Sequence, residues 1–294
     1  MPLATIHLIS LADANTLPAL LQYIKSSDAK PLVLSKPIRW IIRPEHIDPS
    51  SLLDPRWDLL LILEQNPASE KLITSLLNPS PYSTTANHKH NFKTQAHWTT
   101  TAGIPSRLIK DFLAKTNPAL LHPNQKDVPE LTGALNDPLT KDSSQDLSLS
   151  HQLKSWIGTD ESQLPVSGAV SMLNLLSFNP GMKQSYLKYG KAFAETIGAK
   201  RGGNAKLVGN IVRPQHDKQA AGEKKEEEEG VWHEFALAHY PSLLHFADML
   251  ASRDYQEVNQ EHRVGSLGDT CILCTSELEV EKVLADSSNQ KAKL

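Results

Sequence analysis

The chain has 294 residues, and its 30 basic and 33 acidic side chains give a formal net charge of −3 at neutral pH. This near balance gives no electrostatic reason to expect nucleic acid or an anionic membrane as a partner, and no apolar run approaches the ~20 residues of a membrane span. Two cysteines argue against a disulfide scaffold, and the length is sufficient for two domains.

The first hundred residues predict an alternation of strands and helices. Strands are expected over 5–11, 38–43, 57–63 and 95–102, and helices over 17–24 and 69–77. Pro79 and Pro81 follow the second helix and are expected to shorten it. An added helix is predicted over 106–121. The polar stretch 122–163 is typical of a linker with short helical pieces near Leu131 and over 153–157.

The second half predicts the same succession of elements. Strands are expected over 170–178, 206–213, 231–239 and 270–278, with one helix over 181–202 and another beginning at Leu243. Gly202 and Gly203 end the first of these helices, because a helix C-terminus commonly needs a positive φ. Ser242 is a suitable N-cap for the second. The charged insert 223–229 is expected to be a solvated loop.

Four sets of residues recur in the same order in both halves. They are 41–46 with 211–216, Trp57-Asp58 with Trp232-His233, Tyr82 and His88-Lys89 with Tyr255 and His262-Arg263, and 97–100 with 271–274. Each half therefore predicts the order βαββαβ. Helices cover one face of such a sheet, so the other face must be buried elsewhere. We expect an α+β fold of two tandem ferredoxin-like units that close face to face into an intramolecular dimeric α+β barrel.

These boundaries divide the chain into four parts. The first ferredoxin-like unit is expected over 1–105, the extra helix and linker over 106–165, the second unit over 166–280, and a flexible tail over 281–294. Fusion of the units makes their association intramolecular. The chain is expected to be a monomer or a homodimer.

The second half resembles a small bacterial and fungal domain family of unknown function in the dimeric α+β barrel superfamily. The resemblance covers roughly 166–279, with a weaker echo over 5–102, and rests on Trp232-His233, the Tyr240-Pro241-Ser242 turn, Tyr255 and His262-Arg263. It implies the fold, and more loosely a small-molecule enzyme. The superfamily includes cofactor-free monooxygenases, cyclases, isomerases, dehydratases and some haem proteins. Family members carry an acid after the tryptophan; Asp58 keeps it, whereas His233 replaces it in the second half.

Two histidines are the predicted catalytic residues, because a histidine near neutral pKa can move a proton to or from carbon or oxygen. They are His233 and His262; the alternative for the His262-Arg263 pair is a helix cap. The predicted substrate-binding residues are polar groups inside apolar runs: Asn174, Tyr186, Tyr189, Arg213 and Tyr240. His7 occupies the place in the first half that Asn174 occupies in the second. Alternation separates Glu234 and Tyr240 from Phe235 on the third strand, but does not tell which face looks inward.

The expected function is a cofactor-independent cyclase, isomerase or dehydratase acting on a small apolar organic molecule in a secondary-metabolic pathway. No cofactor and no metal are expected, because Cys271 and Cys274 lie three apart on a predicted strand and point to opposite faces. A cofactor-free monooxygenase, a non-catalytic ligand-binding or structural barrel, and a haem- or flavin-binding oxidoreductase remain as alternatives.

The last three residues, Ala292, Lys293 and Leu294, form a close variant of the Ser-Lys-Leu peroxisomal signal. They predict a peroxisomal location with the import receptor as a partner, and a cytoplasmic location otherwise.

Overall fold

Eight antiparallel strands form a closed barrel in the computed structural model, which describes residues 1–77, 91–158, 168–212 and 230–291. The first half contributes β1 (Leu3–Leu11), β2 (Pro31–Ile42), β3 (Leu59–Glu64) and β4 (Thr94–Gly103). The second half contributes β7 (Val170–Phe178), β8 (Asn204–Ile211), β9 (Glu234–Tyr240) and β10 (Leu267–Ser276). The order around the barrel is β1-β3-β2-β10-β7-β9-β8-β4.

Each half keeps its four strands together, so the barrel has two seams. One seam pairs β2 with β10, from Ile42 opposite Ile272 to Lys36 opposite Ser276. The other pairs β4 with β8 through Ala102 and Gly103. The molecule is therefore a mixed α+β protein built on one large antiparallel sheet. A short parallel pair, β5 (Thr140–Lys141) and β6 (Leu149–Ser150), lies apart from it.

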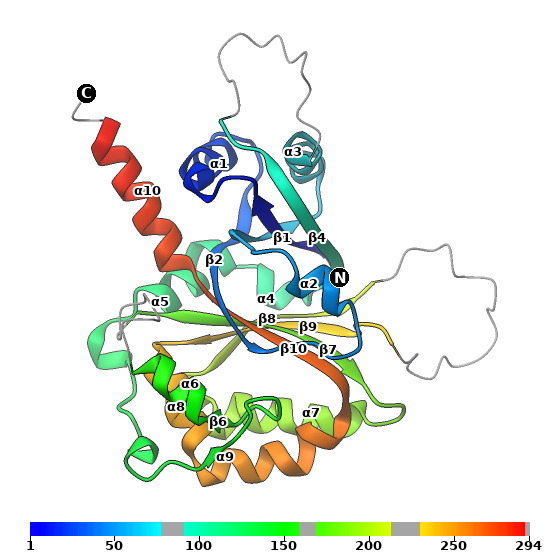
Figure 1. Ribbon diagram of the computed structural model, residues 1–294, viewed down its shortest axis with the longest axis vertical. Helices are drawn as coiled ribbons and strands as arrows, with labels where there is room; N and C mark the ends of the chain where they lie inside the picture. The colour runs from blue at the N-terminus through cyan, green and yellow to red at the C-terminus, as the bar shows by residue number, and fades with distance from the viewer. Residues whose placement is uncertain (78–90, 159–167, 213–229, 292–294) are drawn as a thin grey trace, which may run out of the picture.

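Helices pack on two opposite sides of the barrel (Figure 1). The helices of the first half are α1 (Leu17–Lys25), α2 (Pro49–Leu53) and α3 (Pro67–Leu77), followed by α4 (Ser106–Ile109) and α5 (Asn117–Leu121). Those of the second half are α6 (His151–Ile157), α7 (Lys183–Ala192), α8 (Leu243–Ala251), α9 (Arg253–Val258) and α10 (Glu277–Lys291). In Figure 1, α1 and α3 lie above the strands, and α6 to α9 lie below them. Among the described residues, no helix is long and apolar enough to cross a bilayer.

Strand periodicity divides the core into an interior and two outer layers. On β7, Leu173 and Leu175 fill the barrel interior, whereas Met172 and Leu176 belong to the layer between the second-half strands and their helices. A third cluster fills the corresponding layer of the first half. The same alternation places Cys271 in the interior and the Cys274 side chain in the helix layer, as their spacing predicts, and burial raises the pKa of both thiols.

The local signals for the second-half helices are confirmed. The Ser242 hydroxyl accepts the backbone N–H of His245 at the start of α8. Gly202, at φ 71°, ends the helical segment that continues α7. A Cβ at Gly202 would lie 2.5 Å from the Pro241 ring, so both space and backbone require glycine there.

Two expectations about the connecting segments are corrected. The sequence predicts that the stretch 122–163 is a linker with short helical pieces, and α6 confirms the piece over 153–157. Its described part is more than a connection, however, because Leu147, Leu149 and Leu153 are buried in the second-half helix layer. The segment 281–294 is not a flexible tail up to Lys291, because α10 continues through it and packs Val283 and Leu284 against the first-half core. The insert 223–229, Tyr82 and His88-Lys89 lie outside the described residues.

Candidate functional site

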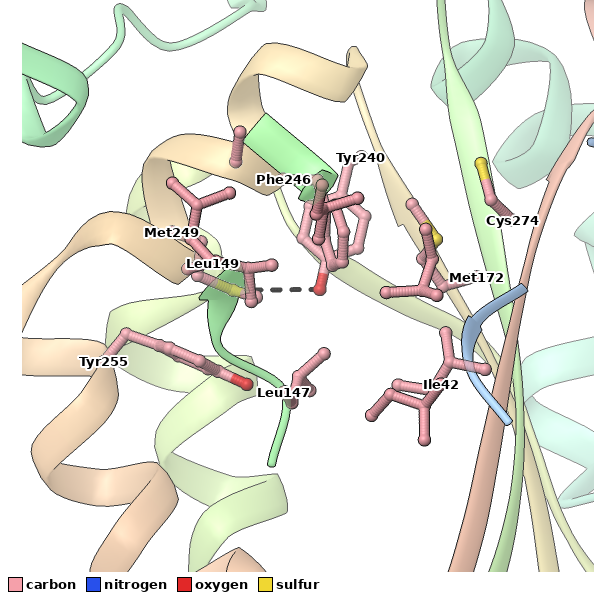
Figure 2. Close-up of a cluster of buried hydrophobic side chains, with 14 of the residues drawn as sticks. Ile42, Leu147, Leu149, Met172, Tyr240, Phe246, Met249, Tyr255 and Cys274 are labelled. Carbon is pink, nitrogen blue, oxygen red and sulfur yellow. Dashed lines mark hydrogen bonds between the residues drawn. The ribbon is translucent and has the colours of Figure 1, made fainter. Parts of the chain in front are cut away.

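Four tyrosines gather between the second-half strands and the helices that cover them; we call this group the tyrosine layer. Tyr186 and Tyr189 come from α7, Tyr255 comes from α9, and Tyr240 ends β9. The rings of Tyr186 and Tyr189 lie 5.5 Å apart between centroids, and the Tyr189 and Tyr255 hydroxyl oxygens lie 3.1 Å apart. In Figure 2 the Tyr240 and Tyr255 hydroxyls point toward the space between the helices and the strands, and Tyr240 donates to Met249 Sδ at 3.7 Å. The layer therefore concentrates phenolic hydroxyls in an apolar setting.

Small and polar side chains form the strand surface beneath this layer. Phe235 and Leu237 fill the barrel interior, so the alternate β9 residues face the helices. Asn174, Ala236 and Val208 lie opposite one another on β7, β9 and β8. All three are partly accessible although they sit mid-strand. Because these side chains are too small to fill the layer, solvent reaches the strands here, and we call this row the accessible floor.

Glu234 stands at the start of β9 on the floor side. It is 8% exposed, and its carboxylate makes no hydrogen bond or ion pair with the described residues. Burial raises its pKa from the usual 4.5 to about 7, against a smaller lowering by the nearby Lys183 ammonium. Its charge is also one of the causes, after burial and Tyr189, that raise the pKa of Tyr186. The Glu234 carboxyl group therefore gains and loses its proton near neutral pH, and it lies near the Tyr186 phenol.

Arg263 closes the opposite end of the layer. It ends the π-helical turn Asn259–Arg263 and is 2% exposed. Its Nη2 donates to Thr270 Oγ1 at 3.5 Å, which is its one hydrogen bond among the described residues. Burial raises the pKa of each tyrosine in the layer, and the guanidinium acts against that rise in all four. The cation therefore faces the phenols.

The register fixes how far apart the strand positions beside the two charged groups lie. Leu176 of β7 pairs with Glu234 on one side and with Thr270 on the other. Because neighbouring strands are about 4.8 Å apart, the backbones of Glu234 and Thr270 are separated by roughly 10 Å. The carboxyl group and the guanidinium thus stand at opposite ends of one row.

The structure brings together four of the residues predicted for substrate binding. Asn174 lies on the floor, where its amide nitrogen donates to Met172 O at 2.8 Å, and Tyr186, Tyr189 and Tyr240 lie in the layer above. Arg213 lies outside the described residues. The sequence interpretation missed Glu234 and Arg263 as site residues. The available signals were the shared alternation of Glu234 with Tyr240 and the recurrence of the His-Arg pair.

The two predicted catalytic histidines lie at the margins of this site. His233 Nδ1 accepts the backbone N–H of Phe178 at 3.0 Å, and its ring stacks on Phe178 with centroids 5.8 Å apart. This bond favours the neutral tautomer protonated at Nε2. His262 sits in the last turn before Arg263, with Nε2 3.5 Å from Glu261 Oε1. Their catalytic role remains a prediction.

The partner of His233 has a counterpart in the first half. Asp58 Oδ2 accepts the backbone N–H of Leu11, the last residue of β1, at 2.7 Å, and Phe178 is the last residue of β7. The acid and the imidazole after the two tryptophans therefore hold the same backbone position. Both residues therefore have a structural role, which is to accept the backbone N–H at the end of the neighbouring strand.

The first half carries a buried histidine at the position that corresponds to Asn174. His7 takes the place of Asn174, but it is buried and its Nδ1 lies 2.9 Å from His97 Nε2. Burial, and then the neighbouring His97, lower the pKa of His7 to about 3, so the ring stays neutral. Leucines fill the surrounding layer, among them Leu20, Leu61 and Leu72. The two halves therefore differ at corresponding positions.

A cavity of about 720 Å³ opens at the seam between β2 and β10. Four of its five charged lining residues are already engaged: Arg56 pairs with Asp58 at 2.7 Å, Lys36 lies 4.0 Å from Glu279, and Arg39 lies 5.1 Å from the centre of the Trp156 ring. The fifth, Asp54, is exposed. Buried charged side chains without an ion-pair partner among the described residues are therefore found in the second-half helix layer, at Glu234 and Arg263, and not in this cavity.

Stability should reveal the unusual titration of Glu234. The group titrates at about 4.5 when unfolded and about 7 when folded. Between these values the folded protein holds the extra proton, so the contribution of Glu234 to the free energy of unfolding falls as pH rises through this window. We expect Glu234→Gln to be more stable than the parent by on the order of 3 kcal/mol near pH 8, and equally stable near pH 4. Urea unfolding at both pH values measures the difference; an offset that is independent of pH would contradict the assignment.

Comparisons with known proteins give little beyond this geometry. No protein-family model matches the sequence, and no curated protein matches it significantly. A solved protein of unknown function from Rhodopseudomonas palustris is 18% identical, covers 42% of this chain and 91% of its own length, and gives a TM-score of 0.32. A candidate monooxygenase from Lactobacillus acidophilus is 8% identical, covers 93% and 92% of the two chains, and gives a TM-score of 0.41. With similarity this low, the function has to be inferred from the residues of the chain itself.

Proposed function

We propose that the second half is a cofactor-independent enzyme that moves a proton on a small organic molecule. The observation that carries the proposal is the buried Glu234 carboxyl group, which has no partner among the described residues and stands at the edge of an accessible floor beneath phenolic hydroxyls. A carboxylate placed this way is suited to be a general base. Hydroxyl donors in an apolar layer are suited to stabilise an oxyanion.

The chemistry follows from these two roles. Glu234 takes a proton from a carbon next to a carbonyl group, and the electron pair of that C–H bond moves onto the carbonyl oxygen as an enolate. The Tyr186 hydroxyl, which makes no hydrogen bond with the described residues, donates to that oxygen. Return of the proton to a different carbon is an isomerisation, and loss of a β-hydroxyl group as water is a dehydration. Attack of the enolate carbon on a second carbonyl group of the same molecule is a cyclisation.

The pKa of Glu234 matches this task. A base works best when its pKa lies near the working pH, because it is then both ionised and basic enough to take the proton. Burial brings the pKa of Glu234 to about 7. Asn174 on the floor is placed to contact the same molecule through its amide oxygen. His233 and His262 remain candidates for a second proton carrier at the margins, and Arg213 for a further contact.

We also propose that the scaffold is a tandem pair of ferredoxin-like units closed into an intramolecular dimeric α+β barrel. The strand order supports this, because β4-β1-β3-β2 and β10-β7-β9-β8 are the same arrangement. The matching backbone bonds made by Asp58 and His233 support it as well. A duplicated scaffold lets one half lose its site while the other keeps it.

A non-catalytic ligand-binding barrel is the second candidate, because an accessible floor under aromatic rings binds a small molecule whether or not a reaction follows. Deuterium exchange separates the two. The protein is incubated in D₂O with acetylacetone, acetoacetate, phenylacetone or phenylpyruvate, and the label at the enolisable carbon is followed by NMR. Exchange above the buffer rate is expected for at least one of them. Binding without exchange across the set would favour the second candidate.

A further inference from the structure

Three cationic side chains of the described chain are almost completely buried, and two of them have carboxylate partners. Arg201, 2% exposed, lies 3.3 Å from Asp248 and 2.9 Å from Asp254. Lys206, 1% exposed, pairs with Glu277. This is the usual state of a buried cation, since an unpaired charge loses its hydration without compensation.

Arg263 is the third, and it departs from this pattern. No carboxylate of the described residues lies within ion-pair distance of its guanidinium, and its one hydrogen bond there is the long contact with Thr270. The phenols around it cannot supply the charge, because burial keeps them neutral. Glu234 stands two strands away. A buried cation with five N–H donors is therefore left without an anion.

We propose that a carboxylate of the bound small molecule is the missing partner of Arg263. This rests on the proposed function only in placing the ligand in the same layer. The guanidinium is a planar fork that matches a carboxylate through two parallel hydrogen bonds. One carboxylate neutralises one guanidinium, whereas a phosphate would bring a second negative charge into this layer, and the other buried cations of the described residues already have carboxylate partners.

The row of paired strands sets the size of such a ligand. Arg263 stands over Thr270, and Glu234 lies roughly 10 Å away across β7. A hydrogen bond of about 3 Å at each end leaves only a short stretch of the molecule between the carboxylate and the carbon that loses its proton, so a small oxo acid can span the row. Leu176 and Ala236 on the strands and the tyrosine rings on the helix side are the apolar surfaces between them. An aryl or unsaturated carboxylic acid fits this arrangement.

Calorimetric titration of the whole chain with phenylpyruvate and phenylacetone tests the proposal, because the two differ in the carboxylate. Phenylpyruvate is expected to bind the parent at least about tenfold more tightly, and Arg263→Gln is expected to remove that advantage, because a hydrogen bond to a charged group is lost. Arg253→Gln, which changes an exposed arginine, is the matched control and should bind as the parent does. Equal binding of the two compounds by the parent, or undiminished phenylpyruvate binding by Arg263→Gln, would overturn the proposal. Inorganic phosphate bound as tightly as phenylpyruvate would also count against a carboxylate site.

A second measurement needs no ligand. If Arg263 is an uncompensated charge in the free protein, Arg263→Met should raise the melting temperature, because a buried cation is replaced by an apolar side chain of similar length. A fall of several degrees would show that the guanidinium is already satisfied, and the proposal would fail. Glu234→Gln separates this from the proposed function. It should still bind phenylpyruvate although it exchanges slowly. Arg263-dependent binding by the parent without any exchange would refute the reaction but not the carboxylate site.

Discussion

Glu234→Gln is expected to slow the exchange of the best enolisable compound by 10²- to 10⁴-fold, the usual contribution of a general base. The substitution keeps the shape of the side chain and removes its ability to accept a proton. The fold should survive, because the carboxylate makes no hydrogen bond or ion pair with the described residues. NMR-detected deuterium incorporation measures the rate, and circular dichroism checks the fold.

The pH profile ties the loss to this carboxyl group. The base form of Glu234 is the ionised one, so the parent rate should rise with pH and level off above about 7. His233→Asn is the matched comparison, since its ring accepts the Phe178 N–H and lies next to Glu234 in the chain. A large loss in His233→Asn with little loss in Glu234→Gln would transfer the role of the base to the histidine.

Lys206→Met is expected to destabilise the protein by about 3–5 kcal/mol, because it removes one partner of a buried ion pair and leaves a carboxylate uncompensated. Glu277 is 5% exposed, and Asn117 binds both charged groups through Lys206 Nζ at 3.0 Å and Glu277 Oε2 at 2.8 Å. The three residues join β8, α5 and the start of α10, so the cost falls on the whole fold. Urea unfolding near neutral pH measures it.

The double variant Lys206→Met with Glu277→Leu is the control for this effect. Once both charges are absent, no carboxylate remains without a partner, and most of the lost stability should return. A double variant as unstable as the single one would show that packing around Lys206, and not its charge, holds these elements together.

Most of the fold could be predicted from the sequence because its signals are local. Alternating apolar residues mark the strands, and Ser242 and Gly202 mark the ends of helices. Long-range pairing could not be read in the same way. β2 begins at Pro31, earlier than its periodicity indicates, because its first part pairs with β3 and its last part with β10. A single strand sequence therefore has to suit two different partner strands, β3 and then β10.

The site was accessible to prediction only in part. The tyrosines and Asn174 were recognisable as polar groups in apolar runs. Glu234 was ambiguous, because alternation gives two faces of a strand without saying which one meets helices. Arg263 follows a helix-end histidine, and only the tertiary structure shows that it turns inward while His262 stays near the surface.

The two seams of the barrel close it unequally. The β2–β10 seam runs along much of both strands, whereas within the described residues β4 meets β8 through Ala102 and Gly103, with one further bond from Val212 N to Thr101 O. A barrel with one long and one short strand pairing between its halves is expected to open first at the short pairing. The short pairing involves β8, the strand that also carries Val208 of the floor. We expect an opening at this pairing to expose the outer edge of the floor, while the β2–β10 pairing keeps the two halves of the barrel together.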